Sequence, residues 1–162
     1  MENQSLIQAL SEEEITAIEA QIAHLPDRQS AAIEALQIVQ KARGWVSDES
    51  IHAIATLLEM SPAELDSIAT FYNLIFREPV GRHVVMVCDS VSCYVMGCDA
   101  VNAAMRDHLQ ITPGQTTQDG RFTLLPIVCL GACDRAPVVL VDEDLHGDVQ
   151  PAEIGAILES YK

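Results

Sequence analysis

The cysteines are the sequence feature that most constrains this chain. All five lie after residue 87, and four of them form two pairs, Cys88 with Cys93 and Cys129 with Cys133. Each pair follows directly on an apolar, β-branched run that is typical of a buried strand. These runs are residues 82–88 (RHVVMVC) and 121–128 (RFTLLPIV). If the two strands are neighbours, both loops open at the same end of the sheet, and the four thiols are predicted to converge there.

Four thiolates on preorganised backbone are what a metal centre requires. The spacing allows zinc, but structural zinc mostly stabilises small folds without a core, and a chain of 162 residues buries a core of its own. A thioredoxin-type dithiol needs Cys-x-x-Cys, which neither pair has. A [2Fe–2S] cluster needs two thiolates for each iron, which two separated pairs supply. The pattern favours iron–sulfur, with zinc or redox-active thiols as the alternatives.

Small residues beside the pairs indicate how the chain would stabilise an anionic cluster. We expect Gly131 and Ala132 to let backbone N–H groups point at the sulfurs, and Gly97 to do the same after the first pair; the alternative is ordinary turns. Arg135 is either a stabiliser of the reduced form or a surface arginine. The fifth cysteine, Cys98, is expected to be a small buried apolar group rather than a spare ligand.

The first half of the chain has a helical period. Apolar residues recur at spacings of three and four, which predicts a small bundle over about residues 11–75. Its start signals are Ser11 with Glu14, Ser47 or Asp48, and Ser61-Pro62-Ala63-Glu64, and Gly44 is a good end signal. The last helix is expected to turn Leu65, Ile68 and Tyr72 inward.

The second half changes to strands alternating with helices. Besides the two cysteine-terminated strands, we expect a strand at 137–141, helices at 96–109 and 151–161, and a polar loop at 111–120. Pro126 indicates a sheet edge or a break, because proline cannot donate to a neighbouring strand. The predicted fold class is α/β, with an N-terminal helical domain at 1–80 and a small α/β sandwich at 81–162.

Charge and composition exclude several functions. The chain has 24 Asp and Glu against 9 Lys and Arg, a net charge of −15, and no basic cluster that would bind nucleic acid or an anionic membrane. The N-terminus MENQSLIQALSEEE lacks the features of a signal peptide, and no apolar run is long enough to span a bilayer. We therefore expect a reducing, cytoplasmic setting. No phosphate loop or catalytic triad signature is present, so no catalytic residue is predicted.

The motifs CDSVSC (88–93), DGRFTLLP (119–126) and CLGAC (129–133) resemble the 24-kDa subunits of respiratory complex I, which in bacteria form the E subunit of NADH:quinone oxidoreductase. The segments IEALQIVQKARGWV (33–46) and IATFYNLIFREPVGRH (68–83) extend the resemblance over nearly the whole chain. It implies a thioredoxin-like [2Fe–2S] ferredoxin domain behind the helical bundle. It also implies one [2Fe–2S] cluster; its ligands would be Cys88, Cys93, Cys129 and Cys133.

The resemblance further implies an electron-transfer subunit with no catalysis of its own. Its cluster would exchange one electron with the FMN of a partner subunit that binds FMN and NADH, and the iron–sulfur subunit of the peripheral arm would lie next to that partner. The complex would hold the chain at the inner face of the bacterial cell membrane, without insertion. The alternatives are the equivalent subunit of an NAD-linked hydrogenase or formate dehydrogenase, and a zinc-stapled interaction module.

Overall fold

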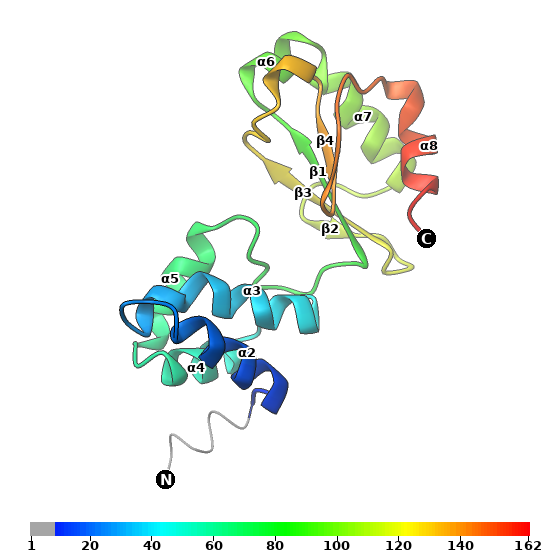
Figure 1. Cartoon of the computed structure of the whole chain (residues 1–162). Helices are drawn as coiled ribbons and strands as arrows, with labels where there is room; N and C mark the ends of the chain where they lie inside the picture. The colour runs from blue at the N-terminus through cyan, green and yellow to red at the C-terminus, as the bar shows by residue number, and fades with distance from the viewer. Residues whose placement is uncertain (1–8) are drawn as a thin grey trace. The chain divides into compact units, whose positions relative to one another are not determined.

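A computed structural model describes residues 9–162 (Figure 1). The first eight residues lie outside the described residues. They make up much of the N-terminal segment on which the signal-peptide prediction rests. The chain divides between Pro79 and Val80 into two compact units, each with its own core.

The described part of the first unit, residues 9–79, contains helices and no strands. Its elements are α2 (Glu12–Ile22), the 3₁₀ turn η1 (Gln29–Ala31), α3 (Ala32–Arg43), α4 (Asp48–Leu57) and α5 (Pro62–Phe71). Side chains cap three of the helices, as predicted. Ser11 and Ser61 each form a reciprocal capping box with the glutamate three residues on, Ser47 accepts from the N–H of Ser50, and Gly44 ends α3 in the left-handed conformation.

Aliphatic side chains fill the core of this unit. The largest ones that are completely buried are Ile18, Leu36, Val39, Val46, Ile54, Leu58 and Leu65. Glu14 is also buried, and Arg43 meets it with two hydrogen bonds, 2.7 Å to Oε1 and 2.5 Å to Oε2. One prediction was wrong: Tyr72 is exposed. Helix α5 ends at Phe71, and Tyr72 has extended backbone, so the helical period no longer sets the direction of its side chain.

The second unit is a mixed sheet with helices, which confirms the α/β class. Its strands are β1 (His83–Cys88), β2 (Gln115–Thr116), β3 (Phe122–Ile127), β4 (Val139–Val141) and β5 (Asp144–His146), in the order β2-β3-β1-β4-β5. Its helical elements are α6 (Val91–Val95), α7 (Cys98–Leu109), η2 (Cys133–Arg135), η3 (Pro151–Glu153) and α8 (Ile154–Glu159). Only the β1–β3 pair is parallel, and the other three pairs are antiparallel.

Helices α7 and α8 lie together on one face of this sheet (Figure 1). Their buried residues join alternate residues of β1, β3 and β4 in one core, which includes Val85, Val101, Met105, Leu124, Val139, Ile154 and Leu158. The short β2 pairs only with Thr123 and Leu124, so the outer side of β3 has no strand partner beyond Leu124 among residues 9–162. Pro126 lies there, where its missing N–H costs no ladder bond, which confirms the predicted edge.

Among residues 9–162, none of the helices has both the length and the apolar character needed to cross a bilayer.

Candidate metal centre

The two cysteine loops leave the sheet side by side. Strands β1 and β3 are parallel neighbours, and their last residues, Cys88 and Ile127, are paired in the register. Asp89 N–H donates to Ile127 O at 3.1 Å, and Cys88 N–H donates to Val138 O at 3.0 Å. These bonds fix the starts of both loops against each other and against the segment that leads into β4. The conditional prediction that both loops open at one end of the sheet is therefore met.

The thiols differ in burial. Cys88 and Cys93 are buried with Cys98, Ala136 and Val138 in a small apolar cluster of their own, distinct from the core under α7 and α8. The thiols of Cys129 and Cys133 are exposed. A group held by both loops would therefore be bonded from the inside by one pair and from the surface by the other.

The two loops also shift the pKa of a cysteine thiol in opposite directions. Burial, reinforced by the neighbouring Cys88 thiol, raises the pKa of Cys93 to about 11. The pKa of Cys129 is lowered, first by the Gly131 N–H that donates to Cys129 Sγ at 3.3 Å and then by Ser90. This bond confirms the expectation that Gly131 directs an amide at sulfur.

The donor set fits a [2Fe–2S] cluster. Cys88 and Cys93 belong to one buried cluster, and Cys129 and Cys133 follow the neighbouring parallel strand, so the structure brings two thiol pairs to one end of the sheet. Over residues 9–162, no three His, Cys, Asp or Glu side chains form a group that could hold a metal ion, so the convergence of all four thiols on one point stays a prediction. A binuclear cluster takes two thiolates on each of its irons, and two separate cysteine pairs can supply them.

Three further residues near the cysteine loops were the subject of predictions. The Gly97 prediction was wrong, because its N–H donates to Tyr94 O at 3.1 Å instead of pointing at a sulfur. Cys98 is buried at the start of α7, as expected, and burial raises the pKa of its thiol. Arg135 is exposed, and its side chain occupies the space above Gly147, where an added Cβ would lie 2.7 Å from Arg135 Cβ and 2.8 Å from its Nε.

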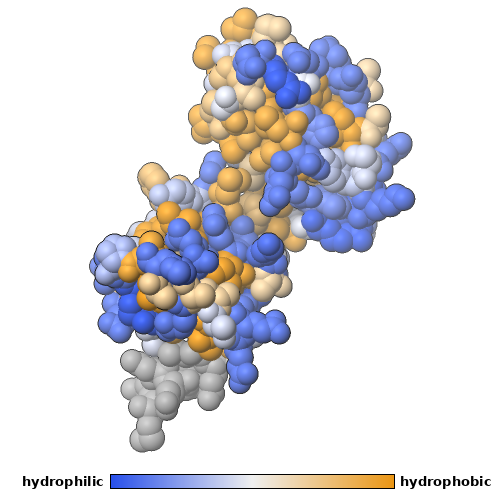
Figure 2. Space-filling view, viewed as in Figure 1, coloured by the Kyte–Doolittle hydropathy of each residue, from blue (hydrophilic) through white to orange (hydrophobic). Residues whose placement is uncertain are grey.

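Sequence reasoning missed the apolar surface beside the loops. Five exposed large hydrophobic residues lie on α6, directly after it, or directly before Cys129: Val91, Tyr94, Val95, Met96 and Val128. Figure 2 shows hydrophobic residues gathered at the end of this unit where α6 lies. The five-residue α6 is too short to show a period, but the apolar run VSCYVM between a predicted strand and a predicted helix was a signal that apolar side chains would face water.

A mixed sheet with two helices on one face and paired cysteine loops at one end defines a thioredoxin-like α/β protein with a thiol-rich site. The chain belongs to the thioredoxin-like [2Fe–2S] ferredoxin family, whose model matches residues 18–162. This confirms the family resemblance drawn from the motifs.

The curated relatives include proteins named as the E subunit of NADH-quinone oxidoreductase. The one from Escherichia coli (strain K12) is 52% identical over 153 residues, which cover 94% of this chain and 92% of the relative. The one from Pseudomonas aeruginosa (strain PAO1) is 49% identical over 165 residues, which cover 99% of both. Among solved structures, an NAD+-reducing [NiFe]-hydrogenase in the air-oxidized state matches with a TM-score of 0.69 and 26% identity. That match covers 85% of this chain and only 24% of the hydrogenase chain.

Proposed function

We propose that this protein is the electron-transferring E subunit of a bacterial NADH:quinone oxidoreductase, complex I. It would carry one [2Fe–2S] cluster on Cys88, Cys93, Cys129 and Cys133. The observation that carries this proposal is the parallel pairing of β1 with β3, which brings two cysteine pairs 35 residues apart to one end of the sheet. The curated oxidoreductase relatives, similar over nearly the whole chain, support the choice of enzyme.

The bound cluster supplies a one-electron redox centre. The chain's own residues would hold and insulate it. Gly131 N–H offsets negative charge on Cys129 Sγ, and the apolar packing around Cys88 and Cys93 keeps water from the inner pair. The exposed Cys129 and Cys133 leave the outer side open to a partner, and the apolar residues of α6 would exclude water once a partner covers them. No residue of the chain is assigned a catalytic role.

The partner would be the subunit that binds NADH and FMN, with the iron–sulfur subunit of the peripheral arm beside it. We propose that the two compact units act as the helical domain at 1–80 and the cluster domain at 81–162. The complex would hold the chain at the inner face of the cell membrane, because the chain itself has a net charge of −15 that anionic lipid repels.

Iron and sulfide analysis with EPR tests the cluster directly. After anaerobic purification, the chain should contain about two iron and two sulfide ions and give an EPR signal when reduced with dithionite. A colourless protein with zinc and no labile sulfide would instead establish the interaction module. The zinc measurement serves as the control, because it distinguishes the wrong metal from an empty site.

The hydrogenase match favours a second function, the corresponding subunit of an NAD-linked hydrogenase. Its identity of 26%, against 52% for the Escherichia coli oxidoreductase relative, makes it the weaker of the two. The two can be separated by purifying the tagged chain from its host within its complex. NADH oxidation coupled to quinone reduction supports the first function, and hydrogen-dependent NAD reduction supports the second.

A further inference from the structure

The end of α5 exposes an apolar surface on the helical unit. Phe71 is 80% exposed, Tyr72 43% and Leu74 49%, and the two rings stack edge-to-face with centroids 5.2 Å apart. Three large apolar side chains are thus exposed within four residues, and two of them are in contact through their rings, which is more than scattered surface hydrophobics. We call these three residues the 71–74 surface.

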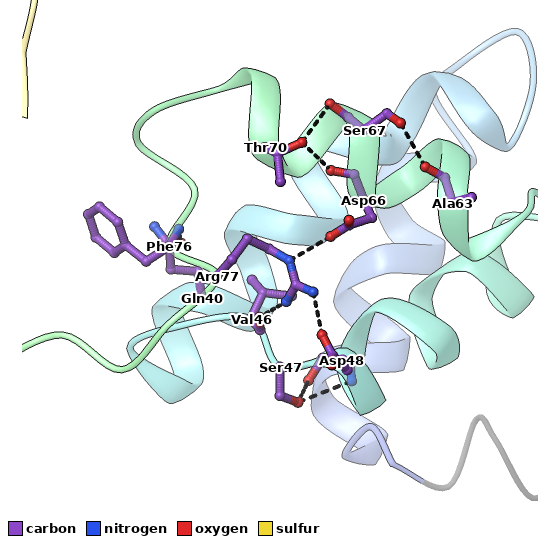
Figure 3. A network of polar contacts seen from close by, with 11 residues as sticks. Gln40, Val46, Ser47, Asp48, Ala63, Asp66, Ser67, Thr70, Phe76 and Arg77 are labelled. Carbon is purple, nitrogen blue, oxygen red and sulfur yellow. Dashed lines mark hydrogen bonds and ion pairs between the residues drawn. The ribbon is translucent and has the colours of Figure 1, made fainter. Parts of the chain in front are cut away.

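Polar contacts, which we call the clamp, hold the backbone that follows α5 (Figure 3). Gln40 Nε2 donates to Leu74 O at 2.8 Å, and Gln40 Oε1 accepts from Phe76 N–H at 2.6 Å. Val46 N–H donates to Phe76 O at 2.8 Å. The backbone after α5 is thus fastened to α3 and to the segment before α4.

Arg77 completes the clamp. Its guanidinium donates to Asp66 Oδ1 at 2.8 Å, to Asp48 Oδ1 at 2.6 Å and to the carbonyl oxygen of Val46. Figure 3 shows it lying between these three groups. Between the clamp residues Ile75 is buried, so it anchors the segment while Phe71 and Leu74 face outward. Preorganisation of this kind lowers the ordering cost of binding.

The charge of the helical unit selects the partner. Residues 1–80 contain thirteen Asp and Glu against four Lys and Arg. Three of those four bases, Arg28, Arg43 and Arg77, are held in ion pairs within the unit. The outer surface of the unit is therefore mostly anionic. A second copy of the chain, itself at −15, would be repelled, and a pocket with a basic rim would be attracted.

We propose that the 71–74 surface docks into an apolar pocket, rimmed by Lys and Arg, on the NADH- and FMN-binding partner subunit. The inference rests on the function proposed above and adds to it a second contact, independent of the cysteine loops. Aromatic and aliphatic anchors in desolvated pockets carry most of the binding energy of protein interfaces. Phe71 and Leu74 are the anchors in this proposal.

The test measures the dissociation constant between the complete, cluster-loaded chain and the host's NADH- and FMN-binding subunit. Phe71→Ser and Leu74→Ser should each raise Kd at least about tenfold, because hot-spot residues have effects of this size. Leu145→Ser, at a residue 40% exposed on the other unit, is the matched control and should change Kd less than about twofold. Higher salt should weaken binding of the wild-type chain. Circular dichroism and the EPR signal should be unchanged in all three variants.

A variant of the clamp tests whether binding depends on how the segment is held in place, and not only on its three apolar side chains. Gln40→Ala removes the two hydrogen bonds from Gln40 to the segment but leaves the three apolar side chains, so it should also raise Kd. Equal Kd values for wild type, Phe71→Ser and Leu74→Ser would overturn the docking proposal and leave the electron-transfer function standing. If the isolated chain forms a dimer and Leu74→Ser dissociates that dimer, the docking proposal would be overturned, because the surface would then bind a second copy of the chain. A wild-type chain with an intact cluster and no affinity for that subunit would overturn the partner assignment as well.

Discussion

The helical unit and the cysteine end of the sheet are built on different principles. In the helical unit, caps, apolar period and ion pairs all favour the same fold, and its largest core side chains are completely buried. At the cysteine end, the buried cluster consists mainly of small residues and thiols, and large apolar side chains face water. The first region is stable through packing, and the second has the composition of a site that would bind a group. A variant in one region should therefore leave the other region's signal unchanged.

The largest effect is expected at the cysteines. Cys93→Ala and Cys129→Ala should each reduce bound iron from about two per chain to almost none, because each removes one of the thiolates that a [2Fe–2S] cluster requires. The absorbance and EPR signals of the cluster should disappear, while the helical circular dichroism is preserved. The iron content of the purified variants is measured to test this.

Cys98→Ala is the matched control for these variants. It removes a thiol that is as buried as that of Cys93 and belongs to the same apolar cluster. It should therefore retain the cluster at full occupancy. A Cys98→Ala chain that lost its iron while Cys93→Ala kept it would contradict the assignment of ligands.

The second prediction changes the helical unit and expects the cluster to be unaffected. Ile54→Ala creates a cavity at a completely buried position in the helical core and should lower the free energy of unfolding of that unit by about 2–5 kcal/mol. The EPR signal of the cluster should be unaffected. Chemical denaturation followed by circular dichroism gives the first quantity. Leu25→Ala, which removes a partly buried side chain packed against the same core, should cost less.

The two regions also differed in what could be predicted. Helix starts were readable because a cap such as Ser61 with Glu64 is a local interaction over three residues. The pairing of β1 with β3 could only be conjectured, because nothing local distinguishes a neighbouring strand from a distant one. Helix α6 and strand β2 were missed, since five and two residues are too few to show a period. The direction of the Tyr72 side chain was predicted wrongly, because the spacing of apolar residues continues in the sequence beyond the point where the helix ends.

The third prediction concerns the buried ion pair of the helical unit. Burial raises the pKa of Glu14, but hydrogen bonds from Arg43 and Ser11 outweigh it and leave that pKa below its ordinary value of 4.5. A carboxyl whose pKa is lower in the folded state stabilises the fold fully above its unfolded value. That contribution is lost as the pH falls below about 4.5 and through the lower folded value.

Arg43→Met tests this linkage, because it leaves the buried Glu14 without its partner. With the arginine side chain one-third exposed, the expected cost at pH 7 is about 1–3 kcal/mol, less than for a fully buried pair. The loss should shrink as the pH falls below 4.5, where Glu14 becomes protonated. Arg28→Met, at a more exposed pair, should cost about 0–1 kcal/mol. Equal costs for the two variants at pH 7 would contradict the role given to burial.

The smallest effect gives the sharpest comparison, because one glycine in each region has nearly the same backbone. Gly44 ends α3 at φ +83° and Gly131 lies between Cys129 and Cys133 at φ +80°, and an added Cβ at either would meet nothing within 4 Å. Alanine should therefore cost each region about 1 kcal/mol of conformational strain alone. Only Gly131 also donates to Cys129 Sγ, so relaxation of that strain would move the amide from the sulfur. Gly131→Ala should shift the reduction potential of the cluster, measured by EPR-monitored titration, and Gly44→Ala should not. Identical potentials would mean that the hydrogen bond at this end of the sheet contributes to folding and not to the redox centre.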